Sequence, residues 1–191
     1  VTLWENLVES HVRVNDFLDL VVRALPAETD EQNVQRVLGY TTRAFWRSLT
    51  AAERSRRAPA LEAMLRAGIT RSATSSAKSA WFSAFRDVAT TPAGVAWLER
   101  VWRRSETIPG LTLAETDEIA MALELAVREV PAWNEILQTQ LDRTQNPDRK
   151  ARFAFVMPAL SADPRTREQA FERMSRVENR RAEPCVLESL A

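Results

Sequence analysis

Apolar residues recur with the period of an α-helix along nearly the whole chain. Six segments show the spacing most clearly, and three of them have apolar faces formed by Val34, Val37, Leu38, Phe45 and Leu49, by Leu61, Met64, Leu65 and Ile69, and by Trp133, Ile136, Leu137 and Leu141. Residues three and four positions apart share one face of a helix. No segment alternates apolar and polar residues for long enough to predict a strand. The sequence therefore predicts an all-α fold.

Short local patterns mark where these helices begin. Capping boxes are predicted at Thr29–Gln32, Thr50–Glu53 and Thr112–Glu115. In a capping box the hydroxyl of the first residue accepts from a free backbone N–H of the first turn, and the side chain three residues later accepts from the backbone N–H of the first residue. Three prolines stand directly after a capping residue, at Thr91-Pro92, Asn146-Pro147 and Asp163-Pro164. Proline suits the first helical position because its missing N–H has no partner there.

Pro158 differs from these because it lies inside an apolar helical pattern, where it should kink or end the helix.

The predicted helix starts are about 19 residues apart, so a helix pair takes about 38 residues, close to the period of helical repeat arrays. Short connections make neighbouring helices antiparallel. The segment Ile119–Val127 is apolar almost all round and is expected to be buried on more than one side. A four-helix bundle would also bury it, but about nine to eleven short helices favour an α-solenoid forming a single domain over 1–191.

Composition removes several classes of function. The 26 basic residues balance 26 acidic ones, so no net field attracts nucleic acid or an anionic membrane. One histidine and one cysteine are too few for a zinc site, and any histidine-based catalytic site would have to use His11. Four glycines form no phosphate-binding loop, and no uncharged apolar stretch is long enough to span a membrane.

Four single residues have structural interpretations. We expect His11 at the surface or a helix end, and Cys185 as a buried structural thiol. Trp46 and Trp97 lie off the apolar stripes of their helices, so they either pack against a neighbouring layer or line a groove. Packing is the favoured interpretation because large aromatic side chains usually occupy cores.

Arginine makes up all the basic residues except Lys78 and Lys150. A locally basic helix lies between Arg54 and Arg71, and a face of mixed charge lies between Asp163 and Glu183. The third concentration, Arg149-Lys150-Ala-Arg152, falls at a predicted helix start, where cations oppose the helix dipole. A placement of that kind suggests a partner anion. A neighbouring carboxylate is the favoured partner, and a ligand is the alternative.

Four stretches of the chain resemble a known family. They are Leu25–Glu31, Val34–Tyr40, Pro109–Glu115 and Asn146–Pro164. Together they are similar to the C-terminal helical domain of bacterial aminopeptidase N-type zinc aminopeptidases. The resemblance covers essentially the whole chain and is densest over 109–190. These are family-typical stretches rather than catalytic motifs, and Cys185 stands where the family pattern leads us to expect tryptophan.

The resemblance implies that this chain is a C-terminal fragment of a longer enzyme. In the family, a right-handed, HEAT-like superhelix closes over a thermolysin-like catalytic domain and limits which peptides enter. The family's His-Glu-x-x-His and Gly-x-Met-Glu-Asn motifs are absent here, so we expect no catalytic residue and no cofactor in this chain, and zinc in the parent's catalytic domain. The chain alone should be inactive.

The partners that the resemblance implies are the catalytic domain of the same polypeptide and peptide substrates. Arg149, Lys150 and Arg152 are the candidate substrate-binding residues, since basic residues of this domain can recognise a peptide's C-terminal carboxylate or backbone, and an arginine fork suits a carboxylate. The alternative is a free-standing α-helical repeat scaffold that binds protein partners on a concave face. A helical nucleic-acid binder is disfavoured by the zero net charge.

Overall fold

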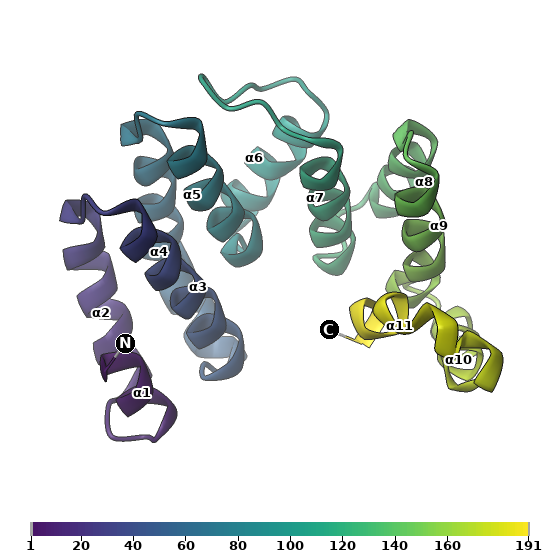
Figure 1. Ribbon diagram of the computed structural model, residues 1–191, viewed down its shortest axis with the longest axis horizontal. Coiled ribbons are helices and arrows are strands. Elements are labelled where there is room, and N and C mark those ends of the chain that lie inside the picture. Colours follow the sequence, from purple (N-terminus) through teal and green to yellow (C-terminus); the bar gives the residue numbers. More distant parts are fainter. Residues whose placement is uncertain (1, 191) are drawn as a thin grey trace. The chain divides into compact units, whose positions relative to one another are not determined.

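The structure, a computed structural model, describes residues 2–190, without the side chains of 180–184, 188 and 190. Over this range the chain is helical and contains no strand, which confirms the all-α prediction (Figure 1). Most connections are short, and the longest, residues 103–114, joins α6 to α7. The helices are α1 (Thr2–Val8), α2 (Val14–Ala24), α3 (Glu31–Arg47), α4 (Ala51–Arg71), α5 (Ser75–Val88), α6 (Pro92–Trp102), α7 (Glu115–Val127), α8 (Trp133–Arg143), α9 (Pro147–Val156), α10 (Pro164–Ser175) and α11 (Glu183–Leu190). Three short 3₁₀ helices are η1 (Leu25–Ala27), η2 (Met157–Leu160) and η3 (Val177–Ala182).

Most of the predicted helix starts are confirmed. Proline occupies the first position of α6, α9 and α10, and the preceding Thr91, Asn146 and Asp163 each accept a hydrogen bond from the first turn. Thr50 forms the predicted capping box, since the Glu53 amide donates to its hydroxyl and its own amide donates to the Glu53 carboxylate. Helix α9 ends at Val156, just before Pro158, as that proline requires.

Two predicted capping boxes are wrong. Helix α3 is capped by Asp30 rather than Thr29, because the Asp30 carboxylate accepts from the amides of Gln32 and Asn33. Helix α7 begins at Glu115, so Thr112 lies outside it. There the Asp117 carboxylate accepts from the Ala114 amide at 2.8 Å, which leaves Glu115 available for another contact.

Three helices end on a residue with a left-handed backbone that is not glycine. Ser10, Arg104 and Glu129 have φ of 64°, 60° and 51° and follow α1, α6 and α7. At each, the amide of the next residue reaches back five positions, to the carbonyls of Asn6, Arg100 and Leu125. This pattern is the Schellman motif, in which glycine is the usual residue because it has no Cβ to crowd the backbone.

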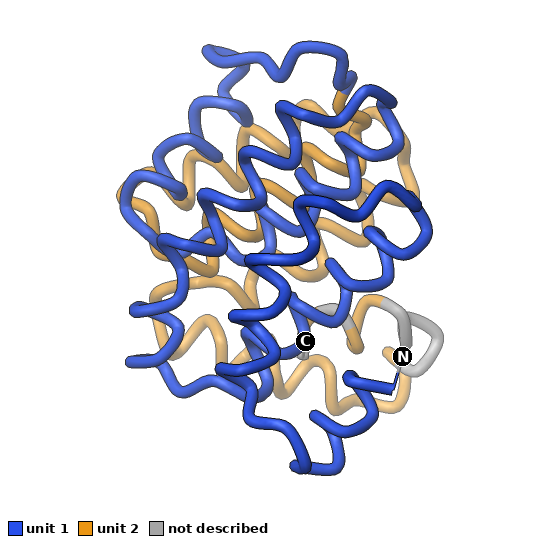
Figure 2. The backbone as a smooth tube through the Cα atoms, turned by 90° about the vertical axis from the view of Figure 1, so that its left-hand side faces the viewer, with its two compact units in different colours: residues 1–112 blue, residues 113–191 orange. Residues whose placement is uncertain are grey.

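The contacts divide the chain into two compact units, residues 1–112 and residues 113–191 (Figure 2). In the first unit, α2 contacts α3 and α4, and α5 contacts both α3 and α4. In the second, α7 packs on α8, and α9 contacts α8 and α11. Each unit thus joins helices to their sequence neighbours and to the next-but-one helix. The single domain over 1–191 stays a prediction.

Glycine and tryptophan bring α4 and α5 together in the first unit. A Cβ added at Gly68 in α4 would lie 2.2 Å from the buried Trp81 indole in α5, so only glycine fits there.

Trp97 of α6 is buried and meets Phe82 and Phe85 of α5 edge-on, with ring centroids 6.1 and 4.8 Å apart. The prediction that Trp97 packs rather than lines a groove is confirmed.

A buried carboxylate fastens the start of α6 to α4. Glu62 accepts hydrogen bonds from the amides of Thr90 and Thr91, both at 2.8 Å, and from the Thr91 hydroxyl. A Cβ at Gly94 would lie 2.3 Å from the same carboxylate. The side chain therefore fills the space that the glycine leaves.

The other single-residue predictions have mixed outcomes. His11 is exposed in the connection after α1, as expected, beside Glu9. Trp46 is 40% exposed, while its indole N–H donates to the carbonyl of Asp87 and its ring lies edge-on to Phe45. Cys185 is half-buried and therefore less covered than the buried structural thiol that we expected.

Candidate functional site

A groove of about 340 Å³ runs between α7 and α9 in the second unit. Helix α7 contributes Ile119, Ala120 and Leu123, which are half-buried, and the neighbouring Thr116. Helix α9 contributes the buried Phe153 and Val156. Most of the lining is therefore aliphatic or aromatic. Among the residues that the structure describes, this groove contains two of the three basic residues predicted to bind substrate.

Arg149 and Arg152 line the groove, and Lys150 does not. The helical period explains this, since residues three apart share a face whereas adjacent residues point about 100° apart. Arg149, Arg152, Phe153 and Val156 thus lie on the side of α9 that faces α7. Lys150 is exposed elsewhere on the same turn. The predicted cluster divides into two groove residues and one surface residue.

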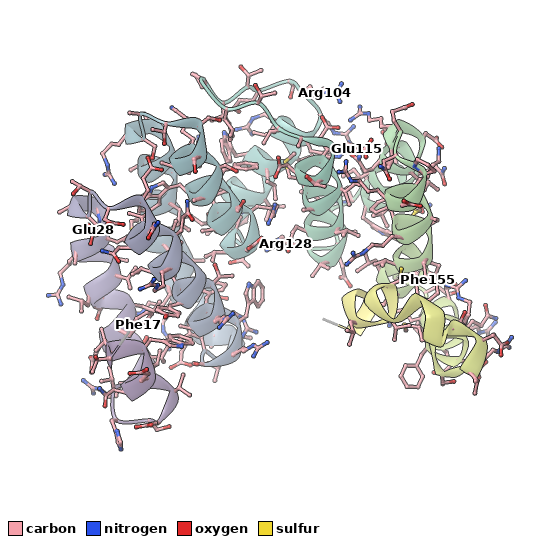
Figure 3. All side chains as sticks on the ribbon, viewed as in Figure 1. Phe17, Glu28, Arg104, Glu115, Arg128 and Phe155 are labelled. Carbon is pink, nitrogen blue, oxygen red and sulfur yellow. The ribbon has the colours of Figure 1, made fainter. Side chains whose placement is uncertain are left out.

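Arg149 forms an ion pair with Glu115. Glu115 is the first residue of α7 and is labelled in Figure 3. The Nη1 of Arg149 lies 3.2 Å from the Glu115 Oε1, and the amides of Gln145 and Asn146 donate to the other carboxylate oxygen at 2.7 and 3.4 Å. The hydrogen bond from the Gln145 amide, together with Arg149, lowers the pKa of Glu115 below its ordinary value. For Arg149, the favoured prediction of a neighbouring carboxylate is confirmed.

The ion pair leaves part of Arg149 accessible. Its side chain is 48% exposed, and only one guanidinium nitrogen faces Glu115 in the pair. Arg152 is also exposed, and it too interacts within the chain. A guanidinium presents five N–H donors in a rigid fork, so one salt bridge leaves donors for a second anion. The groove therefore offers a cationic rim above an apolar floor.

Such an arrangement suits an anion attached to an apolar group. A carboxylate at the rim would receive charge-assisted hydrogen bonds, and a hydrocarbon side chain would displace water from the floor. Among the residues that the structure describes, no three histidine, cysteine or acidic side chains gather as a metal site would require.

The apolar α7 wall of the groove was not part of the predicted site. Ile119 and Leu123 belong to the segment that is apolar almost all round, and this excess of apolar residues was the available signal. The segment is buried on one side through Met121, Ala122, Leu125 and Ala126, while Val127 is 57% exposed. The partly covered Ile119 and Leu123 form the α7 wall of the groove.

Sequence comparison does not place the chain in a family, since no family model and no curated protein matches it significantly. Over residues 2–190, no helix has both the length and the apolar character needed to cross a membrane.

Proposed function

We propose that this chain is the C-terminal helical domain of a zinc metallo-aminopeptidase. In this role it encloses the catalytic chamber of the parent enzyme, where N-terminal amino acids are removed from peptides, and helps to select the peptides that enter. The zinc and the catalytic residues belong to the parent's catalytic domain. The fold proposed with this function is a right-handed, HEAT-like superhelix, as in the family that the sequence resembles. Support comes from the all-helical fold and from the resemblance of four sequence stretches to this family.

The single observation that carries the peptide-selecting role is the groove between α7 and α9. A peptide's C-terminal carboxylate is a planar anion that an arginine fork binds in bidentate geometry. Arg149 and Arg152 supply such forks at the rim, and Ile119 and Leu123 supply an apolar wall for the adjoining side chain. Lys150 lies outside the groove and has no part in this contact.

The kinetic test uses the parent enzyme. Arg149→Ala and Arg152→Ala should raise KM for peptides by about tenfold, the equivalent of one lost charge-assisted hydrogen bond, and leave small chromogenic substrates unaffected. Small substrates do not extend to a site remote from the scissile bond. Lys150→Ala is the matched control, because it removes a cation from the same turn outside the groove. If all three variants process peptides normally, Arg149 and Arg152 serve only as structural ion-pair residues.

A second test separates this function from that of a free-standing scaffold. The open reading frame upstream of Val1 should encode a His-Glu-x-x-His motif. A start codon immediately before Val1 would instead favour a helical repeat scaffold that binds protein partners.

A third test assays the chain by itself. The purified chain should hold no stoichiometric zinc and hydrolyse no aminoacyl arylamide. Turnover by the chain alone would overturn the proposed division of labour.

A further inference from the structure

A second cleft lies in the first unit, where the connection between α1 and α2 meets the end of α3. Its volume is about 810 Å³. The walls from α1 and the connection are mostly apolar, and Val8 is 65% exposed within them. Trp4 is fixed at one side, because its ring stacks on Tyr40 with centroids 4.6 Å apart and meets Phe17 edge-on. Phe17 is labelled in Figure 3. The apolar wall is therefore preformed.

Two arginines of α3 face this cleft one turn apart. Arg43 and Arg47 are exposed and line it, and neither side chain makes an ion pair or hydrogen bond with any residue that the structure describes. Like charges four residues apart destabilise a helix. The macrodipole favours Arg47, which is the last residue of α3, but its effect is confined to the last turn and does not account for Arg43 as well.

Among the residues that the structure describes, no carboxylate lines the cleft to balance these charges. Asp16 of α2 directly follows the lining residue Asn15, but its carboxylate is paired with Arg13. The Nε and Nη2 of Arg13 donate to the two carboxylate oxygens of Asp16 at 2.8 and 3.1 Å. Glu9 lies beside His11, 3.4 Å from the ring. The cleft is thus cationic along one wall and apolar along the other, in a chain whose net charge is zero.

We propose that this cleft binds an acidic amphipathic helix of a partner protein. Two carboxylates one turn apart on such a helix match the spacing of Arg43 and Arg47, since both pairs follow the same helical period. Its neighbouring aliphatic side chains cover the exposed Val8 and the edge of Trp4. Charge complementarity sets the orientation and the apolar wall adds contact area.

The probe for this interaction is a fluorescein-labelled synthetic helix of about four turns, with glutamates four residues apart and leucines on the adjoining face. Fluorescence anisotropy is measured with the full chain at low and high ionic strength. The Arg43→Gln/Arg47→Gln double variant should bind at least about tenfold more weakly, and its binding should depend less on salt. Val8→Asp, which places a carboxylate on the exposed apolar wall, should weaken binding as well.

Matched controls remove the same charge elsewhere in the unit. Arg36→Gln/Arg71→Gln changes two exposed arginines outside the cleft and should bind the probe within about twofold of the unmodified chain. A probe with glutamine in place of glutamate should bind weakly to every variant. Circular dichroism melts establish that each variant is folded, and Val8→Asp provides the test if the double arginine variant is not.

Three outcomes would overturn the proposal. These are equal affinity for the glutamate and glutamine probes, equal affinity of the Arg43→Gln/Arg47→Gln and control double variants, and tighter binding of a single-stranded oligonucleotide that depends on the same arginines. The cleft lies in the first unit and the proposed substrate groove in the second. The two assignments therefore succeed or fail independently.

Discussion

Glu115 and Arg149 are 34 residues apart in sequence, and their side chains join the first turns of α7 and α9 at 3.2 Å. The same carboxylate accepts from the backbone just before Pro147, so it fixes both the start of α9 and the guanidinium at the groove rim. Arg149 thus has a structural contact in addition to its proposed role in substrate binding. A loss of peptide affinity in Arg149→Ala has to be compared with the effect of Glu115→Gln, which removes the negative charge of the ion pair and keeps the arginine.

The stability that Glu115 contributes should depend on pH. Its pKa is lowered in the folded chain, so its contribution is complete above its ordinary value of 4.5 and is lost as the pH falls through the lowered folded value. Glu115→Gln should therefore melt below the unmodified chain at neutral pH, and the difference should shrink in acid. Thermal melts across this range measure it. Lys150→Gln, a one-charge change on the first turn of α9, should show no such convergence.

Gly39 and Gly68, two of the three helical glycines of the first unit, should respond to alanine with opposite signs. Gly68→Ala forces a Cβ against the Trp81 indole and should destabilise the chain by about 1–3 kcal/mol. Gly39 in α3 has no atom within 4 Å of an added Cβ, so Gly39→Ala should stabilise the chain by up to about 1 kcal/mol through helix propensity. Urea denaturation measures both, and effects of the same sign would contradict the packing described for α4 and α5.

Removal of the Glu62 carboxylate should cost more than its neutralisation. Glu62→Ala leaves the Thr90 and Thr91 amides without their acceptor and opens a void, and we expect a loss of about 2–4 kcal/mol. Glu62→Gln keeps a carbonyl oxygen in the same place and should lose about 1 kcal/mol. Equal losses in denaturant titrations would show that the two amide hydrogen bonds contribute little.

Glycine at the end of α7 should stabilise the second unit. Glu129 has φ of 51°, and its side chain makes no hydrogen bond or ion pair with any described residue, so Glu129→Gly relieves a backbone cost and removes no side-chain contact of that kind. We expect a gain of about 0.5–1 kcal/mol, since part of the relief is offset by the greater entropy of glycine in the unfolded chain. Gly110→Ala, which places a Cβ at φ 74°, should have the opposite effect in the same melting experiment.

Features encoded by neighbouring residues could be predicted from the sequence. Helix starts at Pro92, Pro147 and Pro164 depend on a capping residue and a proline side by side, and the structure has all three. Helix ends were less visible, because Ser10, Arg104 and Glu129 stand where glycine would have marked a Schellman motif. These ends depend on backbone strain that the surrounding structure tolerates.

Features that join distant residues could be predicted only in part. The charge imbalance at the start of α9 correctly indicated an anionic partner, but Glu115 was assigned to a capping box for its own helix. No local pattern shows that residue 115 lies beside residue 149, since this depends on how α7 and α9 pack. For the same reason, Ile119 and Leu123 could be recognised as apolar residues of α7 but not as the wall of a groove.

The fit of Glu62 against Gly94 has an evolutionary consequence. The carboxylate occupies the volume that a side chain at 94 would need, so the two positions should not vary independently among homologues. Sequences with alanine or serine at 94 should carry a shorter residue at 62, and those with a long acid at 62 should retain glycine at 94. A mutational path from glutamate at 62 with glycine at 94 to a short residue at 62 with alanine at 94 should shorten residue 62 first. The reverse order would place alanine at 94 against the glutamate at 62, and that combination does not fit while α4 and α6 keep their present separation.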